Sequence, residues 1–243
     1  MIELIHRYPI AIKVLLAVVT LAFIGTGGWI VGSESEGQYA AKVGDSVIGL
    51  DEYQKALYNT EDTYRQVYQG NIPEGFMEKL NLPRRTLDSL IDKRVLLLEA
   101  EKRGIQVSDE ELSEAVLEVQ AFKGDGGSFS KERYEDVLKA NNMTPAVFER
   151  AMRQDMVVEK FKKVIKDAVY VQDAEVLEYY KKQVAGQGKE FKQEEFESQK
   201  MSIFQMLTNT AQDKTLRSMV QALRRGYMEK DLIVENTDLG IKG

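Results

Sequence analysis

The chain of 243 residues carries a formal net charge of −6, a hydrophobic content of 43% and no cysteine. The absence of cysteine excludes disulfides, thiolate catalysis and cysteine-ligated zinc sites. The acidic balance, without a basic stripe interleaved with aromatic residues, argues against a nucleic-acid-binding protein, because contacts to phosphates dominate that affinity.

The first charge-free stretch of the chain covers residues 14–31. At about 1.5 Å of rise per residue, a helix of this length approaches the roughly 30 Å hydrocarbon thickness of a bilayer. Arg7 and Lys13 precede the stretch and Glu34 and Glu36 follow it, so the positive-inside rule places its N-terminal side in the cytoplasm. The predicted organisation is a cytoplasmic tail at 1–13, a transmembrane anchor at 14–32, a linker at 33–39 and a bacterial periplasmic domain at 40–243.

A cleaved secretory signal is the alternative to a retained anchor. Residues 14–24 alone have the length of a signal core, and small residues at 25–27 could serve a peptidase. Retention is favoured because the apolar run resumes at Trp29, which also supplies an interfacial aromatic ring. Both alternatives export the same domain. The residues assigned to the anchor are Val14, Leu15, Leu16, Leu21, Phe23, Ile24, Trp29 and Ile30.

The first elements after the linker are a hairpin and a helix. Two short apolar runs around Gly44 predict the hairpin over residues 40–48. Gly49 is a permissive N-cap with Glu52 three residues on, and the apolar spacing that follows predicts a helix to about residue 69. Residues 71–81 contain a proline and a glycine and are expected to form a loop.

Helices dominate the rest of the chain. Pro83 suits the first turn of a helix that ends at Gly104, and Ser108 with Glu111 forms a capping box for a helix to about residue 122. Further helices are predicted after the caps at Ser130 and at residues 144–145, over 173–184 and over about 193–227, with a glycine-rich loop at 123–129 and a break at 186–188.

The alternating run at 232–237 is predicted to be a strand without a local partner. Because backbone groups need hydrogen-bond partners, it should pair with the hairpin at 40–48. The predicted fold class is therefore mainly α: an N-terminal transmembrane helix followed by a helical lobe, with a small antiparallel β element that joins its two ends.

The order of these segments carries a family resemblance. It comprises AAKVGDSVIGLDEY, LDSLIDKRVLLLEAEKRGIQVSDEEL, FSKERYEDVLKANNMTPAVFERAMRQDMVVEKF and DAEVLEYYKKQ. Over about residues 40–183 this set resembles the N-terminal chaperone lobe of SurA and PpiD type periplasmic folding factors. The segment from about 196 to 239 is similar to the long helix and closing strand that end such proteins, and the PpiD type would include an uncleaved anchor.

One departure from that family concerns catalysis. The resemblance implies a parvulin prolyl isomerase domain after the helix at 173–183, yet only residues 184–190 separate that helix from the closing one. Parvulin-type sites also use histidines, and the one histidine of the chain is His6, before the predicted span. We therefore expect a chaperone lobe that lacks the isomerase domain and its activity.

The expected functional surface is apolar and adaptable. No Ser/His/Asp or Cys/His set can be assembled, and neighbouring acids such as Glu110 and Glu111 point to different faces of a helix, so no catalytic residue, metal site or cofactor is predicted. Methionine and aromatic side chains re-pack around varied partners, although the same helical spacing also fits a core. The candidate client-binding residues are Phe122, Phe148, Met152, Met156, Met201, Phe204, Met206 and Met219.

The leading interpretation is a membrane-tethered periplasmic holdase that works without ATP on unfolded or newly translocated polypeptides. Its expected partners are those exported polypeptides and inner-membrane lipid, with the secretion translocon as a further candidate and nucleic acid excluded. Two alternatives stay open: a dedicated assembly or scaffolding subunit of one envelope complex, and a divergent peptidyl-prolyl isomerase.

Overall fold

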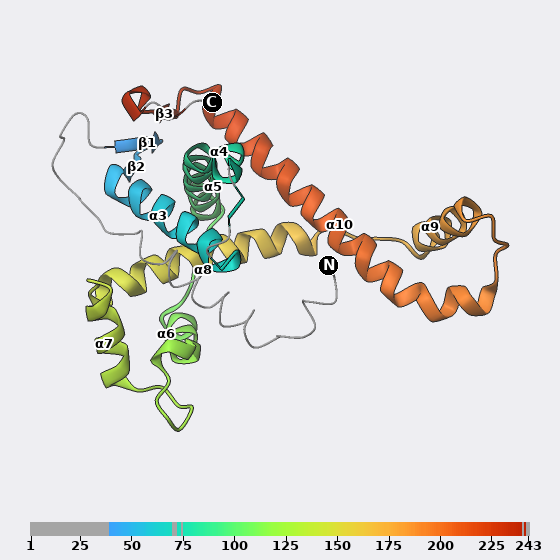
Figure 1. The fold of residues 1–243 in the computed structure, drawn as a ribbon, viewed down its shortest axis with the longest axis horizontal. Coiled ribbons are helices and arrows are strands. Elements are labelled where there is room, and N and C mark those ends of the chain that lie inside the picture. The colour runs from blue at the N-terminus through green and yellow to red at the C-terminus, as the bar shows by residue number, and fades with distance from the viewer. Residues whose placement is uncertain (1–38, 70–71, 74, 240, 242–243) are drawn as a thin grey trace. The chain divides into compact units, whose positions relative to one another are not determined.

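The computed structural model describes residues 39–69, 72–73, 75–239 and 241. They form a mainly helical protein with one small antiparallel sheet, which confirms the predicted class (Figure 1). The predicted anchor at 14–32 and the tail before it lie outside the described residues. Within the described ranges, no helix combines the length and apolarity needed to cross a membrane.

The chain divides into two compact units. The first unit contains the described residues up to Val158 and those from Tyr227 onward, and the second is Glu159–Gly226. The domain expected at 40–243 therefore comprises two units, and helices α8 and α10 contribute residues to both.

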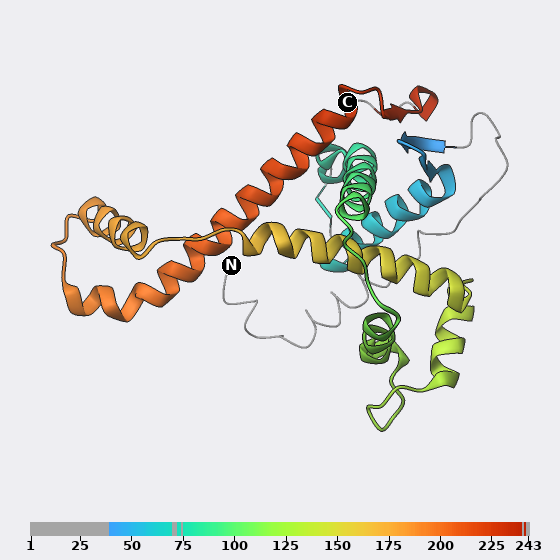
Figure 2. The ribbon, with the colours of Figure 1, turned by 180° about the vertical axis from the view of Figure 1, so that it is seen from behind.

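Figures 1 and 2 show the helices and strands from two opposite sides, coloured in chain order from blue to red. They are β1 (Tyr39–Val43), β2 (Ser46–Gly49), α3 (Leu50–Val67), α4 (Phe76–Leu80), α5 (Leu82–Lys102), α6 (Asp109–Glu118), a 3₁₀ turn (Gln120–Phe122), α7 (Lys131–Ala140), α8 (Pro145–Asp167), α9 (Asp173–Gly186), α10 (Gln193–Met228), β3 (Ile233–Glu235) and a second 3₁₀ turn (Thr237–Leu239).

The sheet has the strand order β2-β1-β3 and joins residues from both ends of the described chain. Gly44 turns the hairpin with φ of +56°, a value that costs glycine little. β3 pairs antiparallel with β1, with Val234 opposite Lys42. The pairing predicted for the closing strand is thereby confirmed. On the inner face, Val43 and Ile48 are completely buried.

Helix α5 is the centre of the first unit and contacts both α3 and β1. Its face at Leu87, Ile91 and Val95 is at most 1% exposed, as the apolar spacing of this helix predicted. α5 also holds the closing segment, because Arg84 donates to Glu235 of β3 at 2.6 and 3.0 Å.

Two predictions of local secondary structure are wrong. The loop expected at 71–81 contains helix α4, where the Phe76 ring lies 5.1 Å from that of Tyr68, the residue that follows α3. The helix expected to reach residue 122 ends at Glu118 and gives way to a 3₁₀ turn. In both places an aromatic residue packs against rings from other elements, and this contact prevails over local signals.

The second unit is built around α9 and α10. Its core consists of Val171, Val176, Tyr180, Val184, Phe196 and Ile203. Residues 187–192 connect the two helices, and Gly188 adopts φ of +67° within that connection. The break predicted at 186–188 thus falls at the end of α9.

Candidate functional site

The inner face of α10 is fixed by aromatic packing against α9. The Tyr180 ring lies 5.4 Å from Phe196 and 5.9 Å from Phe191, centre to centre. Ile203, two turns after Phe196, is 6% exposed in the same core. Since a helix turns by about 100° per residue, Met201 and Phe204 lie to one side of this inner row, on one flank of α10.

A hollow of about 360 Å³ opens on that flank. Its lining comprises Asp173, Glu197, Lys200, Met201 and Phe204, and we call it the α9/α10 hollow. Met201 is 67% exposed, whereas Phe204 is half-buried and packs against the core. The hollow thus has a partly buried aromatic side chain on one side and an exposed, flexible thioether beside it.

Charged side chains form the rim of the α9/α10 hollow. Lys200 Nζ donates to Asp173 Oδ2 at 2.7 Å and so links α10 to the first residue of α9. This hydrogen bond raises the pKa of the Lys200 ammonium above its ordinary value. The pair is exposed to solvent, so its effect is to position the rim rather than to add much stability.

The other predicted client-binding methionines lie elsewhere. Met206 is 40% exposed and lies on the opposite flank of α10, where the Tyr179 hydroxyl donates to its Sδ at 3.8 Å. Met219, farther along α10, is half-buried, as are Met152 and Met156 on α8. The structure therefore brings together two of the predicted residues, Met201 and Phe204, at one hollow.

Phe122 and Phe148 are core residues in this structure, with no exposed surface. Their rings lie 5.3 Å apart, and Tyr134 packs 4.9 Å from Phe122. The Tyr134 hydroxyl donates to Glu149, and burial raises the pKa of that phenol. The sequence spacing of Phe122 and Phe148 is compatible with a surface or a core position. Their edge-to-face packing with Tyr134 explains why both are buried in the core.

Sequence reasoning missed the polar part of the hollow. Glu197, Lys200 and Phe204 recur at helical spacing on α10, so a search for polar residues on the flank of Phe204 could have found the first two. Asp173 belongs to α9 and reaches the hollow only because α9 packs against α10 in the core of the second unit. Over the ranges that the structure describes, no cluster of three or more metal-ligating residues occurs.

Comparison with known families identifies the first part of the chain. The family model for the SurA-like N-terminal domain matches residues 1–162. The chain belongs to the SurA-like N-terminal domain family. The match ends within α8, so the α9/α10 hollow lies beyond the SurA-like part of the sequence.

Curated relatives of this SurA-like chain are periplasmic chaperones named PpiD. The protein from Escherichia coli is 28% identical over 159 residues, which is 62% of this chain and 25% of that protein. The protein from Haemophilus ducreyi is 25% identical over 176 residues, 68% of this chain and 27% of that protein. The matched region spans about a quarter of the length of these relatives, and it confirms the predicted resemblance to SurA and PpiD type chaperones.

Proposed function

We propose that this protein is a membrane-tethered periplasmic holdase that binds unfolded polypeptides at the α9/α10 hollow. The observation that carries the proposal is an exposed methionine, Met201, beside a half-buried aromatic residue, Phe204, at a hollow of about 360 Å³. Apolar segments of a client gain free energy by leaving water there, and the flexible thioether accommodates different side chains.

The rim chemistry agrees with transient binding. Asp173, Glu197 and Lys200 keep the surroundings of the hollow polar, so the apolar contact stays small and a client can dissociate. Membership of the SurA-like family and the names of the PpiD relatives support a chaperone rather than an enzyme. The uncharged stretch at 14–31 supports the tether, and the short connection at 187–192 supports the absence of an isomerase domain at that point.

The decisive test measures aggregation of an unfolded outer-membrane protein in the presence of the full chain in lipid nanodiscs. We expect suppression by the unmodified chain and about fivefold weaker suppression by Met201→Gln, because a polar amide replaces apolar contact area. Met228→Gln is the matched control, since Met228 is 46% exposed and lies outside the hollow. No suppression at several-fold excess, or equal effects of the two variants, would refute the proposal.

Two further measurements separate the alternatives. A photoreactive group at Met201 in living cells should crosslink to many exported polypeptides, whereas one stoichiometric partner would favour a dedicated assembly subunit. A tetrapeptide isomerisation assay should give the spontaneous rate, and acceleration would favour a divergent isomerase.

A further inference from the structure

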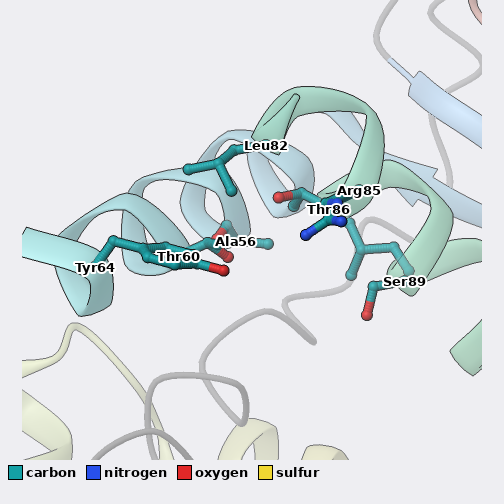
Figure 3. Close-up of a pocket in the computed structure, with 8 residues that line it drawn as sticks. Ala56, Thr60, Tyr64, Leu82, Arg85, Thr86 and Ser89 are labelled. Atoms are coloured by element: carbon teal, nitrogen blue, oxygen red, sulfur yellow. The ribbon is translucent and has the colours of Figure 1, made fainter. Parts of the chain in front are cut away.

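A second hollow occurs in the first unit, between α3 and α5 (Figure 3). Its volume is about 160 Å³, and its apolar wall includes Ala56, Leu82 and Leu90, each at most 4% exposed. A cavity of about this size accommodates one benzene-sized group. The α3/α5 pocket, as we call it, therefore has room for one apolar side chain.

Within this pocket, one buried hydroxyl has no hydrogen-bond partner. Thr86 on α5 is 6% exposed, and its Oγ1 is fully buried without a partner. Figure 3 shows the Thr86 side chain among the lining residues, between α5 and α3. The neighbouring hydroxyl of Thr60 differs, because it donates to the Ala56 carbonyl at 2.8 Å. Buried polar groups are nearly always satisfied, so the Thr86 hydroxyl has the capacity for one further hydrogen bond at this pocket.

A positively charged side chain lies at the same pocket. Arg85 lines the pocket, is exposed, and makes no ion pair with any residue in the described ranges. Its neighbour Arg84 instead bonds Asp88 and Glu235. A guanidinium is always charged and its planar fork matches a carboxylate, so Arg85 favours an anionic group at the mouth of the pocket.

We propose that the α3/α5 pocket binds the C-terminal apolar residue of a polypeptide. The side chain enters the apolar space, the terminal carboxylate pairs with Arg85, and the Thr86 hydroxyl gains a hydrogen bond to the bound residue. A chain terminus fits better than an internal residue, because its carboxylate and its side chain are attached to the same carbon. The inference rests on the proposed function only in taking a polypeptide as the ligand, and it concerns a different surface.

The first experiment compares two fluorescent pentapeptides that end in leucine, one with a free carboxylate and one amidated. Binding to the full chain in nanodiscs is measured by fluorescence anisotropy. We expect amidation to weaken binding about fivefold, as for an exposed charge pair. Arg85→Gln should abolish the difference between the peptides. Arg217→Gln, at an exposed arginine of α10 outside the pocket, should preserve it.

The second experiment uses the hydroxyl. Thr86→Val removes an unpaired buried polar atom at nearly constant shape, so thermal stability should stay unchanged or rise while binding of the free-acid peptide weakens several-fold. Thr208→Val is the matched control, because the Thr208 hydroxyl is also buried without a partner but lies in the second unit. This control should leave peptide binding unchanged.

The outcomes distinguish this inference from the proposed function. Equal binding of the acid and amide peptides, or an undiminished difference in Arg85→Gln, would overturn the pocket assignment. A Thr86→Val variant that binds the free acid as well as the unmodified chain would exclude a role for the hydroxyl. Met201→Gln should change suppression of aggregation and leave the ratio of the two peptide affinities intact, so either proposal can fail alone.

Discussion

At the scale of single residues, the pair of Glu52 and Arg94 shows how a tertiary contact replaces a local one. Arg94 Nη2 lies 3.0 and 2.9 Å from the two carboxylate oxygens of Glu52. The side chains are only 14% exposed for Arg94 and 11% for Glu52. Burial raises the pKa of the Glu52 carboxyl, while Arg94 opposes that rise. The Glu52 carboxylate therefore pairs with Arg94 of α5 and does not cap the N-terminus of α3, which has no side-chain cap.

Removing one partner of this pair should be costly and dependent on pH. We expect Arg94→Gln to lower the free energy of unfolding by about 2–3 kcal/mol at pH 8, because a buried carboxylate loses its compensating charge. The substitution raises the folded-state pKa of Glu52 further above its unfolded value. As the pH falls through the folded pKa, the folded state takes up a proton and regains stability, so the loss at pH 5 should be smaller.

Urea unfolding at several pH values measures both effects. The matched control is Arg103→Gln at the C-cap of the same helix, where the arginine paired with Glu99 is 48% exposed. Exposed pairs contribute at most about 1 kcal/mol, so the control should cost little at every pH. Equal losses in the two variants would show that Glu52 is not buried as described.

At the scale of elements, local signals predicted starts better than ends. The capping box of α6 lies within four consecutive residues: Ser108 Oγ accepts from the Glu111 amide at 3.2 Å, and Glu111 accepts from the Ser108 amide at 2.9 Å. Such a start is visible in sequence. Helix α4 and the end of α6 were not predictable in this way, because Phe76 and Phe122 pack on rings that only the fold brings near.

The candidate site illustrates the same limit. Periodicity placed Met201 and Phe204 on α10, but it could not separate an exposed methionine from a buried phenylalanine such as Phe148, since both recur at helical spacing. The cross-helix ion pair of Asp173 and Lys200 depends on how α9 packs against α10, about which the sequence alone says nothing.

Loss of the α6 cap should be measurable. We expect Ser108→Ala to cost about 1 kcal/mol of folding free energy, because the Glu111 amide loses its partner. Hydrogen exchange should accelerate in the first turn of α6, and the midpoint of urea unfolding should move to a lower urea concentration. Ser198→Ala is the control, since Ser198 is exposed and its hydroxyl donates to the Glu195 carbonyl within α10. A loss in the control equal to that in Ser108→Ala would contradict a capping role.

At the scale of the whole molecule, the first unit is closed by its own ends. β1 near the start of the described chain and β3 near its end are hydrogen-bonded neighbours, and Asn236 extends the ladder by donating to the Ala40 carbonyl at 3.0 Å. Tyr227 adds a second link, since its hydroxyl donates to Glu99 on α5 at 3.0 Å. The segment between β1 and β3 is therefore closed by this strand pair together with the side-chain links to α5, and closing so long a segment costs chain entropy.

A covalent link across that pair should stabilise the molecule. The chain has no cysteine, so Lys42→Cys with Val234→Cys introduces a single thiol pair at directly opposed residues. Opposed residues on neighbouring antiparallel strands have Cα atoms about 4.5–5.5 Å apart, within disulfide range. Because the enclosed loop is long, the oxidised protein should gain about 2–4 kcal/mol over the reduced one in urea unfolding.

The matched control exploits the strand order. Val47 also lies opposite Lys42, but on β2, so β1 separates it from Val234. Two strand spacings put those Cα atoms roughly 9–10 Å apart, beyond the reach of a disulfide. Val47→Cys with Val234→Cys should therefore remain reduced and gain nothing, although both valines are exposed, at 52% and 46%. Ready oxidation of this control, or failure of the Lys42 and Val234 variant to oxidise, would mean that β3 does not close the sheet beside β1.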